Sequence, residues 1–242
     1  MSIDISVIIP TINEALYIGE TLKCVTSQTF GLRSEIIVCD GGSTDKTVEI
    51  AAKYAKVFVC PTRNTGAQLD FAVGFSKGSI LVFLDADTII PDNYLQRVYD
   101  SFEKDANLYA CGATFVYAGR KRHIMKLGAI STTITENILI NFAMYLWYIL
   151  RDVFHFTEIS GCNFCVRRDV FLEVGGFGHS HSAPVDVALS TGIRELIRRR
   201  GKGKMRILRS ITVLTSPRHV TLKRSIKIAK DYRKTLARVS RN

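Results

Sequence analysis

Two aspartates, Asp85 and Asp87, follow an apolar run directly and are separated by a single alanine in the stretch LVFLDADT. Two carboxylates this close at the end of a buried strand repel each other unless a cation neutralises them. Hard divalent ions such as Mg²⁺ and Mn²⁺ prefer oxygen ligands, and a phosphorylated ligand often completes their coordination shell. The pair therefore indicates a divalent metal that holds a diphosphate. The alternative is two exposed loop acids.

The elements that must position this pair can be predicted from hydrophobic patterning. Short runs rich in β-branched and aromatic residues predict buried strands at 5–10, 35–39, 56–60 and 79–84. Helical patterns lie between them, at 14–28, 45–54 and 66–76. This alternation predicts an α/β fold with a largely parallel sheet and helices on both faces.

Polar residues and glycines follow each of these strands, where ligands collect in parallel sheets. They are Pro10, Thr11, Asn13 and Glu14 after the first strand, Asp40 after the second, Arg63 and Gly66 after the third, and Asp85, Ala86 and Asp87 after the fourth. Their convergence at one edge is a stronger indication of a site than any one segment alone.

The second half of the chain predicts further strands at 108–117, at 161–168 and between 205 and 216. Residues 127–150 are apolar with one charge, and their longest uncharged part, 137–150, has only 14 residues. A bilayer crossing needs roughly 20 apolar residues. The segment is therefore expected to form a buried or interfacial helix.

Positive charge is concentrated at one end of the chain. The net charge is +11, and from Arg194 onward 17 Lys and Arg residues accompany two acids. A basic end on a mildly acidic body indicates an anionic partner, namely a membrane surface, a nucleic acid or a phosphorylated ligand. The alternative is a solvated tail that aids solubility. Cations at 223, 227, 230, 234 and 238 share one helical face, which predicts a peripheral helix on anionic lipid.

The cysteines and the N-terminus bear on location. Cys162 and Cys165 form a CxxC, but no second CxxC supplies the remaining ligands of a structural zinc site. Buried thiols in a reducing cytosol are expected rather than a metal or redox role. The N-terminus has no basic region and no small-residue cleavage site, so no secretory signal is expected. These features predict a cytoplasmic protein.

Five segments in this order resemble family 2 glycosyltransferases: SVIIPTINE, VCDGGSTDKT, RNTGAQLDFAVG, FLDADT and GCNFCVRRDVFLEVGGF. The resemblance runs from about residue 5 to 192, and more loosely through 215–219. It implies the GT-A fold, a Rossmann-like α/β domain, and inverting, metal-dependent transfer of a sugar from a nucleoside-diphosphate sugar to an acceptor. The expected catalytic domain is 1–217, with a nucleotide half of about 1–118 and an acceptor half of 119–217. A basic helical segment, 218–242, follows.

The resemblance also implies site residues. The nucleotide-binding set comprises Pro10, Thr11, Asn13, Glu14, Asp40, Arg63, Gly66, Gln68, Asp85, Ala86, Asp87 and Arg218. In the family the first aspartate of the FLDADT segment typically faces the ribose and the second faces the metal, which is expected to be Mg²⁺ or Mn²⁺. His219 is the candidate for a third metal ligand. The chain departs from the family at Ile12, where an aromatic residue is common, and at Gly41, where a second acid is common.

Asp186 matches the position of the general base on the acceptor side, although Val185 replaces its usual acidic neighbour. The alternative is that Asp186 is the N-cap of a helix over 187–200. The chain also resembles polyprenyl-phosphate sugar synthases, and a phosphate acceptor would need no strong base. The apolar segment 127–150 and the basic C-terminus would suit a lipid phosphate at a membrane face.

Two other classes of function were weighed against the sugar transferase. A nucleotidyltransferase of similar fold should have a glycine-rich loop with a basic residue after the first strand, where this chain has PTINEA. A non-catalytic domain would use its basic end to bind a membrane or a nucleic acid. Acidic strand ends would repel a phosphate backbone, so no nucleic-acid partner is expected. The expected location is cytoplasmic, with peripheral contact to the membrane.

Overall fold

The computed structural model describes residues 3–29, 33–60, 62–117, 159–178 and 184–219. The chain divides into two units, one formed by residues 1–114 and 158–213 and the other by 115–157 and 214–242. The helix expected within 127–150 and the basic helix expected beyond residue 219 lie outside the described residues. The predicted boundaries of the catalytic domain and of its two halves stay predictions.

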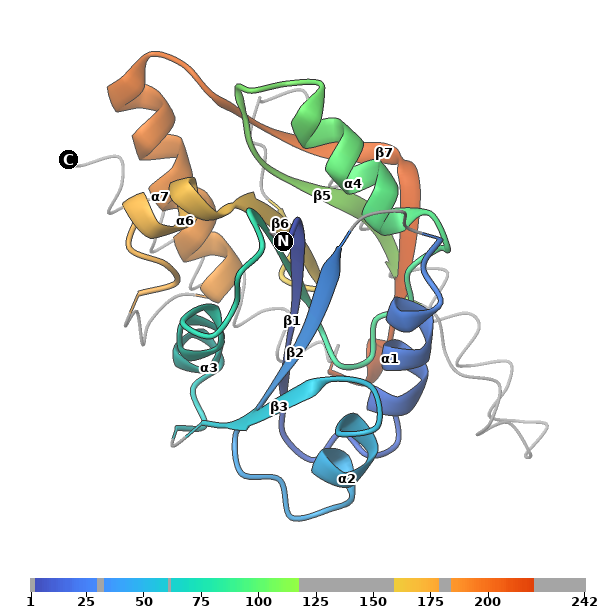
Figure 1. Cartoon of the computed structure of the whole chain (residues 1–242). Helices are drawn as coiled ribbons and strands as arrows, with labels where there is room; N and C mark the ends of the chain where they lie inside the picture. Colours follow the sequence, from blue (N-terminus) through green and yellow to red (C-terminus); the bar gives the residue numbers. More distant parts are fainter. Residues whose placement is uncertain (1–2, 30–32, 61, 118–158, 179–183, 220–242) are drawn as a thin grey trace. The chain divides into compact units, whose positions relative to one another are not determined.

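Seven strands form one sheet in the order β3-β2-β1-β4-β6-β5-β7 (Figure 1). They are β1 (Ile5–Thr11), β2 (Ser34–Asp40), β3 (Lys56–Val59), β4 (Ile80–Leu84), β5 (Leu108–Tyr117), β6 (Asn163–Arg167) and β7 (Lys204–Thr215). β1 pairs in parallel with β2 and β4, and β2 pairs in parallel with β3. β6 is antiparallel to both β4 and β5. The predicted α/β fold with a largely parallel sheet is confirmed.

Helices cover both faces of the sheet. They are α1 (Ile18–Thr26), α2 (Thr47–Ala51), α3 (Thr65–Val73), α4 (Tyr94–Glu103), α6 (Arg168–Glu173) and α7 (Val185–Arg200), and a short 3-10 helix, η2, covers Pro217–His219. Figure 1 shows α3, α6 and α7 on one face and α1 and α4 on the other. The larger core cluster lies under the first group, where Ile8, Phe83 and Phe164 of the strands pack with Leu69 and Ile193 of the helices.

The order of the strands decides where a ligand can bind. From β1 the chain moves outward to β2 and β3, and it then returns to place β4 on the other side of β1. In parallel sheets whose strand order reverses in this way, ligands usually bind outside the carboxyl ends of the two strands where the order reverses. By this rule a ligand is expected at the carboxyl ends of β1 and β4.

Several elements differ from the sequence-based expectation, among them α6, which was not predicted. α1 begins at Ile18 rather than near residue 14, because the preceding residues are bound to a neighbouring loop, as described below. α4 was not predicted, although its buried Tyr94, Val98 and Phe102 are spaced as one helical face. β7 runs without a break through both of the short strand patterns expected between 205 and 216.

Among the described residues, no helix combines the length and hydropathy needed to cross a membrane.

Candidate functional site

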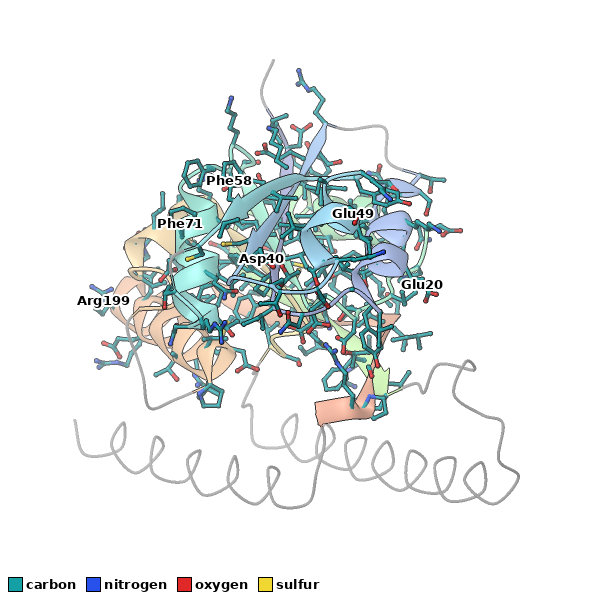
Figure 2. All side chains as sticks on the ribbon, turned by 90° about the horizontal axis from the view of Figure 1, so that it is seen from below. Glu20, Asp40, Glu49, Phe58, Phe71 and Arg199 are labelled. Atoms are coloured by element: carbon teal, nitrogen blue, oxygen red, sulfur yellow. The ribbon has the colours of Figure 1, made fainter. Side chains whose placement is uncertain are left out.

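The carboxylate of Asp40 organises the loop that follows β2. It is 1% exposed, and the strand register places it opposite Thr11, whose Oγ1 donates to Asp40 Oδ1 over 3.0 Å. Asp40 Oδ2 accepts the backbone N–H groups of Gly42 and Ser43 at 2.9 and 2.7 Å, and the Ser43 hydroxyl donates to Oδ1. Figure 2 shows Asp40 enclosed by side chains, whereas Glu20 lies at the outer surface. Four donors thus occupy this carboxylate, and its predicted contact with base and ribose stays a prediction.

The loop after β1 is bound to the loop after β2. Asn13 has a φ of 54°, in the left-handed region, which asparagine tolerates better than most residues. Its Oδ1 accepts the backbone N–H of Thr44 at 2.9 Å, and its own N–H donates to Ser43 Oγ at 2.8 Å. The Asn13 side chain, predicted to line the nucleotide pocket, therefore also holds the two loops together.

Asp45 extends this connection. Its carboxylate accepts N–H groups from Ala15, at 3.2 Å, and from Thr47, at 2.9 Å, as well as the Thr47 hydroxyl. Thr47 Oγ1 in turn accepts the Glu14 N–H at 2.7 Å. Slight burial raises the pKa of Asp45, but the hydrogen bonds from Thr47 and Ala15 outweigh it and lower the pKa overall. The first turn of α2 and the segment before α1 are thereby held as one unit.

The segment after β4 is held by contacts that the sequence pattern did not reveal. Thr21 of α1, itself buried, donates to the carbonyl oxygen of Ala86 at 2.8 Å, and the Thr88 N–H donates to the carbonyl of Asp85 at 3.1 Å. Asp85 is exposed, while Asp87 is 7% exposed. The turn thus presents one carboxylate to solvent and keeps the other at the edge of the core.

These two side chains fit a divalent ion in their donor chemistry. Both provide hard oxygen ligands, and the fully buried Thr88 Oγ1 beside them has no hydrogen-bond partner within the described ranges. The described residues contain no cluster of three or more His, Cys, Asp or Glu that could hold a metal by itself. An ion held by Asp85 and Asp87 would therefore depend on oxygen atoms from a ligand, as is common for Mg²⁺.

Asp186 reaches the same region from α7. The helix begins at Val185 with Pro184 as its N-cap, so Asp186 lies in the first turn and is not the cap residue. Its Oδ2 accepts the N–H of Gly161 and its Oδ1 that of Val187, both at 3.0 Å. The interpretation of Asp186 as the helix cap is thus wrong, because its carboxylate is directed to the loop before β6.

Cys162 connects the two acidic segments. Its carbonyl accepts the Asp85 N–H at 3.5 Å, and its neighbour Gly161 donates to Asp186. Burial raises the pKa of the Cys162 thiol to about 12, with further increases from the negative charges of Asp85 and Asp186. Asp85 and Asp186 therefore both contact the Gly161–Cys162 turn, one through its backbone N–H and the other through its carboxylate.

The CxxC is not a chelating pair. The Cys165 thiol lies 3.3 Å from the hydroxyl of Tyr94 in α4. The Cys162 thiol, in the turn before β6, lies 3.4 Å from Ser160 Oγ and 3.3 Å from Asn163 Nδ2.

The start of α3 packs against the start of α7. Gly66 is buried, and a Cβ built there would lie 3.2 Å from Val185 Cγ1 and 3.4 Å from Phe177 Cβ. Asp70 of the same helix accepts the Phe177 N–H at 2.9 Å, which holds the glycine-rich turn after α6. Val185, which replaces the usual acidic neighbour of Asp186, therefore serves as a packing contact between the two helices.

The remaining predicted residues fall in different places. Arg63 is exposed on the loop before α3, and Gln68 is buried on α3 itself. Arg218 and His219 belong to the second unit, in η2, so their predicted roles toward the diphosphate and the metal stay predictions.

The chain is similar to several known proteins in sequence or fold. The dolichol-phosphate mannosyltransferase of Pyrococcus furiosus is 25% identical over 232 residues, covering 89% of this chain and 62% of the relative. The mannosyltransferase PcManGT from Pyrobaculum calidifontis, solved with GDP-Man and Mn²⁺, has a TM-score of 0.72 at 18% identity, covering 100% of this chain and 65% of that one. TarS 1-349 of S. aureus with UDP-GlcNAc has a TM-score of 0.65 at 18% identity, covering 90% and 60%.

The likeness to these solved glycosyltransferases confirms the predicted GT-A fold class. The chain spans about three fifths of the length of the mannosyltransferase relative. A family model described as Glycosyl transferase family 2 matches residues 6–175, which is well over half of the chain. The chain therefore belongs to glycosyl transferase family 2.

Proposed function

We propose that this protein transfers a sugar, with inversion, from a nucleoside-diphosphate sugar to an acceptor hydroxyl or lipid phosphate, with Mg²⁺ or Mn²⁺ as cofactor. The observation that carries the proposal is that Asp85 and Asp186 are both hydrogen-bonded to the Gly161–Cys162 turn. A donor-side carboxylate and an acceptor-side carboxylate then act in one place. The names of the family and of the relatives support the same class of reaction.

The donor nucleotide binds against the loops after β1 and β2, which are hydrogen-bonded to each other. Because Asp40 and Asn13 are already committed to these loops, they set the shape of the pocket before the nucleotide arrives. Arg63, exposed before α3, supplies a fixed positive charge for phosphate oxygens. Asp85 and Asp87 would hold the divalent ion. When bound, that ion neutralises the charge that develops on the departing diphosphate.

On the acceptor side, an oxygen of the acceptor attacks the anomeric carbon as the bond from that carbon to the diphosphate breaks. A hydroxyl acceptor gives its proton to the Asp186 carboxylate, which Gly161 and Val187 hold in position. A phosphate acceptor is already anionic and needs no base. The name of the P. furiosus relative favours a polyprenyl-phosphate acceptor, and so does the basic end of the chain. Peripheral contact with the cytoplasmic membrane face is part of this proposal.

Nucleotide binding gives the first test. We expect a panel of nucleoside diphosphates to raise the melting temperature only when Mn²⁺ is present, with a preference for one base. Asp87→Asn should abolish the stabilisation by nucleotide and Mn²⁺, because it removes an anionic ligand of the metal ion. Glu49→Gln, an exposed change on α2, should leave it intact. Failure of every nucleotide to stabilise the wild type with Mn²⁺ would refute the proposal.

Product analysis tests the transfer itself. The protein should be incubated with a set of sugar nucleotides and with sugar or polyprenyl-phosphate acceptors, and the anomeric configuration of the product read by NMR. Inversion supports the proposed single displacement, whereas retention would contradict it.

A further inference from the structure

The space beside Gly41 is filled by a side chain from another element. Gly41 follows Asp40 at the end of β2, and a Cβ built on it would lie 2.1 Å from Gln68 Nε2 and 3.2 Å from Gln68 Cδ. Gly41 is not among the glycines with a positive φ, so the backbone does not require glycine there. A methyl group at this position would instead displace the Gln68 carboxamide.

That carboxamide is buried and fixed by one bond. Gln68 is 2% exposed, and its Nε2 donates to the carbonyl oxygen of Thr62 at 3.2 Å. A carboxamide has two N–H donors and an oxygen with two lone pairs. Within the part of the chain that the structure describes, this is the one hydrogen bond of the Gln68 side chain. The printed bond uses only Nε2, so Oε1 and the second N–H make no hydrogen bond to the described residues and could bind a ligand.

The neighbouring acid, Asp40, has no free oxygen with which to bind a ligand. Asp40 accepts four hydrogen bonds from Thr11, Gly42 and Ser43, so both of its oxygens are occupied within the protein. Position 41, directly after it, carries no side chain. Among the groups at this end of β2, the Gln68 carboxamide therefore keeps unused hydrogen-bonding capacity.

We infer that Gln68 selects the base of the bound nucleotide. Its carboxamide occupies the space beside Gly41 and presents its hydrogen-bonding groups to the base. The inference rests on the proposed function, because it assumes that a nucleotide lies against the loops after β1 and β2. Gln68 Oε1 accepts an N–H from the edge of the base, and its second N–H can donate to a neighbouring ring acceptor or carbonyl. Residue 68 is a specificity-determining residue rather than a catalytic one.

The test measures dissociation constants of UDP, GDP, CDP and ADP with Mn²⁺ by calorimetry. Gln68→Met keeps the volume of the side chain but removes its hydrogen bonds. It should weaken binding of the preferred nucleotide roughly three- to tenfold and change the others less than twofold. Gln96→Met, on α4 where Gln96 bonds to Asp100, is the matched control and should keep the preference.

A double-mutant cycle tests the part played by Gly41. Gly41→Ala should reduce the preference when Gln68 is present, because the added methyl group displaces the carboxamide. In a Gln68→Ala background, Gly41→Ala should change the base preference by less than twofold. Melting temperatures establish that each variant is folded. An unchanged base preference in a folded Gln68→Met protein would overturn the inference alone, whereas a wild type that binds no nucleotide would overturn the proposed function as well.

Discussion

Asp186, the proposed general base, also has a structural role. Both of its oxygens accept backbone N–H groups, one from Gly161 and one from Val187. These bonds fix the direction of the carboxylate relative to the loop before β6. A fixed carboxylate is a good proton acceptor for a hydroxyl, but it contributes little to an acceptor that is already ionised.

Replacing Asp186 with Asn distinguishes the two acceptor classes. With a hydroxyl acceptor, kcat should fall several hundred-fold because the base is lost, on the scale of about 10²–10⁴ for such groups. With a phosphate acceptor the loss should be only a few-fold. Steady-state rates measured with both acceptors decide between them. Asp169→Asn, an exposed change on α6, is the control and should have no effect on either.

At the scale of elements, the loops that carry the proposed site are joined to one another by hydrogen bonds. The segment before α1 and the first turn of α2 share the carboxylate of Asp45, and the turn after β4 is attached to α1 through Thr21. In the same way, Gly66 and Val185 join α3 to α7. The loops at the sheet edge therefore form a preorganised group, which lowers the entropic cost of binding.

Asp45→Ala tests this preorganisation. The variant loses the hydrogen bonds to Ala15 and Thr47, so the free energy of unfolding should fall by about 0.5–2 kcal/mol, as for a lost helix cap. Nucleotide binding should weaken while kcat at saturation stays close to that of the wild type. Chemical denaturation and calorimetry measure the two effects. Glu49→Ala on the same helix should leave both nearly unchanged, and equal losses in the two variants would contradict this account.

At the scale of the whole molecule, the opposite edge of the sheet is held by a buried carboxylate. Glu35 is 7% exposed and accepts bonds from Ser6 Oγ at 2.9 Å, the Lys77 N–H at 2.6 Å and Lys56 Nζ at 3.1 Å. Burial raises its pKa, but the bonds from Lys77, Lys56 and Ser6 outweigh burial and lower the pKa below the ordinary 4.5. Glu35 lies near the start of β2, at the end of that strand away from Asp40 and the proposed site.

Glu35→Gln should therefore show a pH-dependent effect on stability. The lowered pKa means that the folded state binds fewer protons than the unfolded state, so this contribution is fully present above about pH 4.5 and is lost as the pH falls through the lower, folded value. At pH 7 the variant should lose about 1–3 kcal/mol of unfolding free energy. The difference from the wild type should shrink below pH 4. A difference that stays constant from pH 7 to pH 3 would exclude the linkage, and nucleotide affinity at pH 7 should not change.

The sequence by itself determined the strands, the order of the α/β units and the set of polar segments at one edge of the sheet. These features depend on short-range patterning and on the rule that parallel strands end at the same edge, so they can be predicted without coordinates. The aspartates after β4 were recognised in this way.

Only the tertiary structure decided how those segments meet. That Asp40 is occupied by Thr11 and Ser43, and that Gln68 fills the space at Gly41, depends on register and on contacts between residues far apart in the chain. The burial expected for the thiols of Cys162 and Cys165 is confirmed, but their individual contacts could not be predicted from the CxxC spacing. Local patterns predict which elements form, whereas the partner of each buried polar group is set by packing between elements.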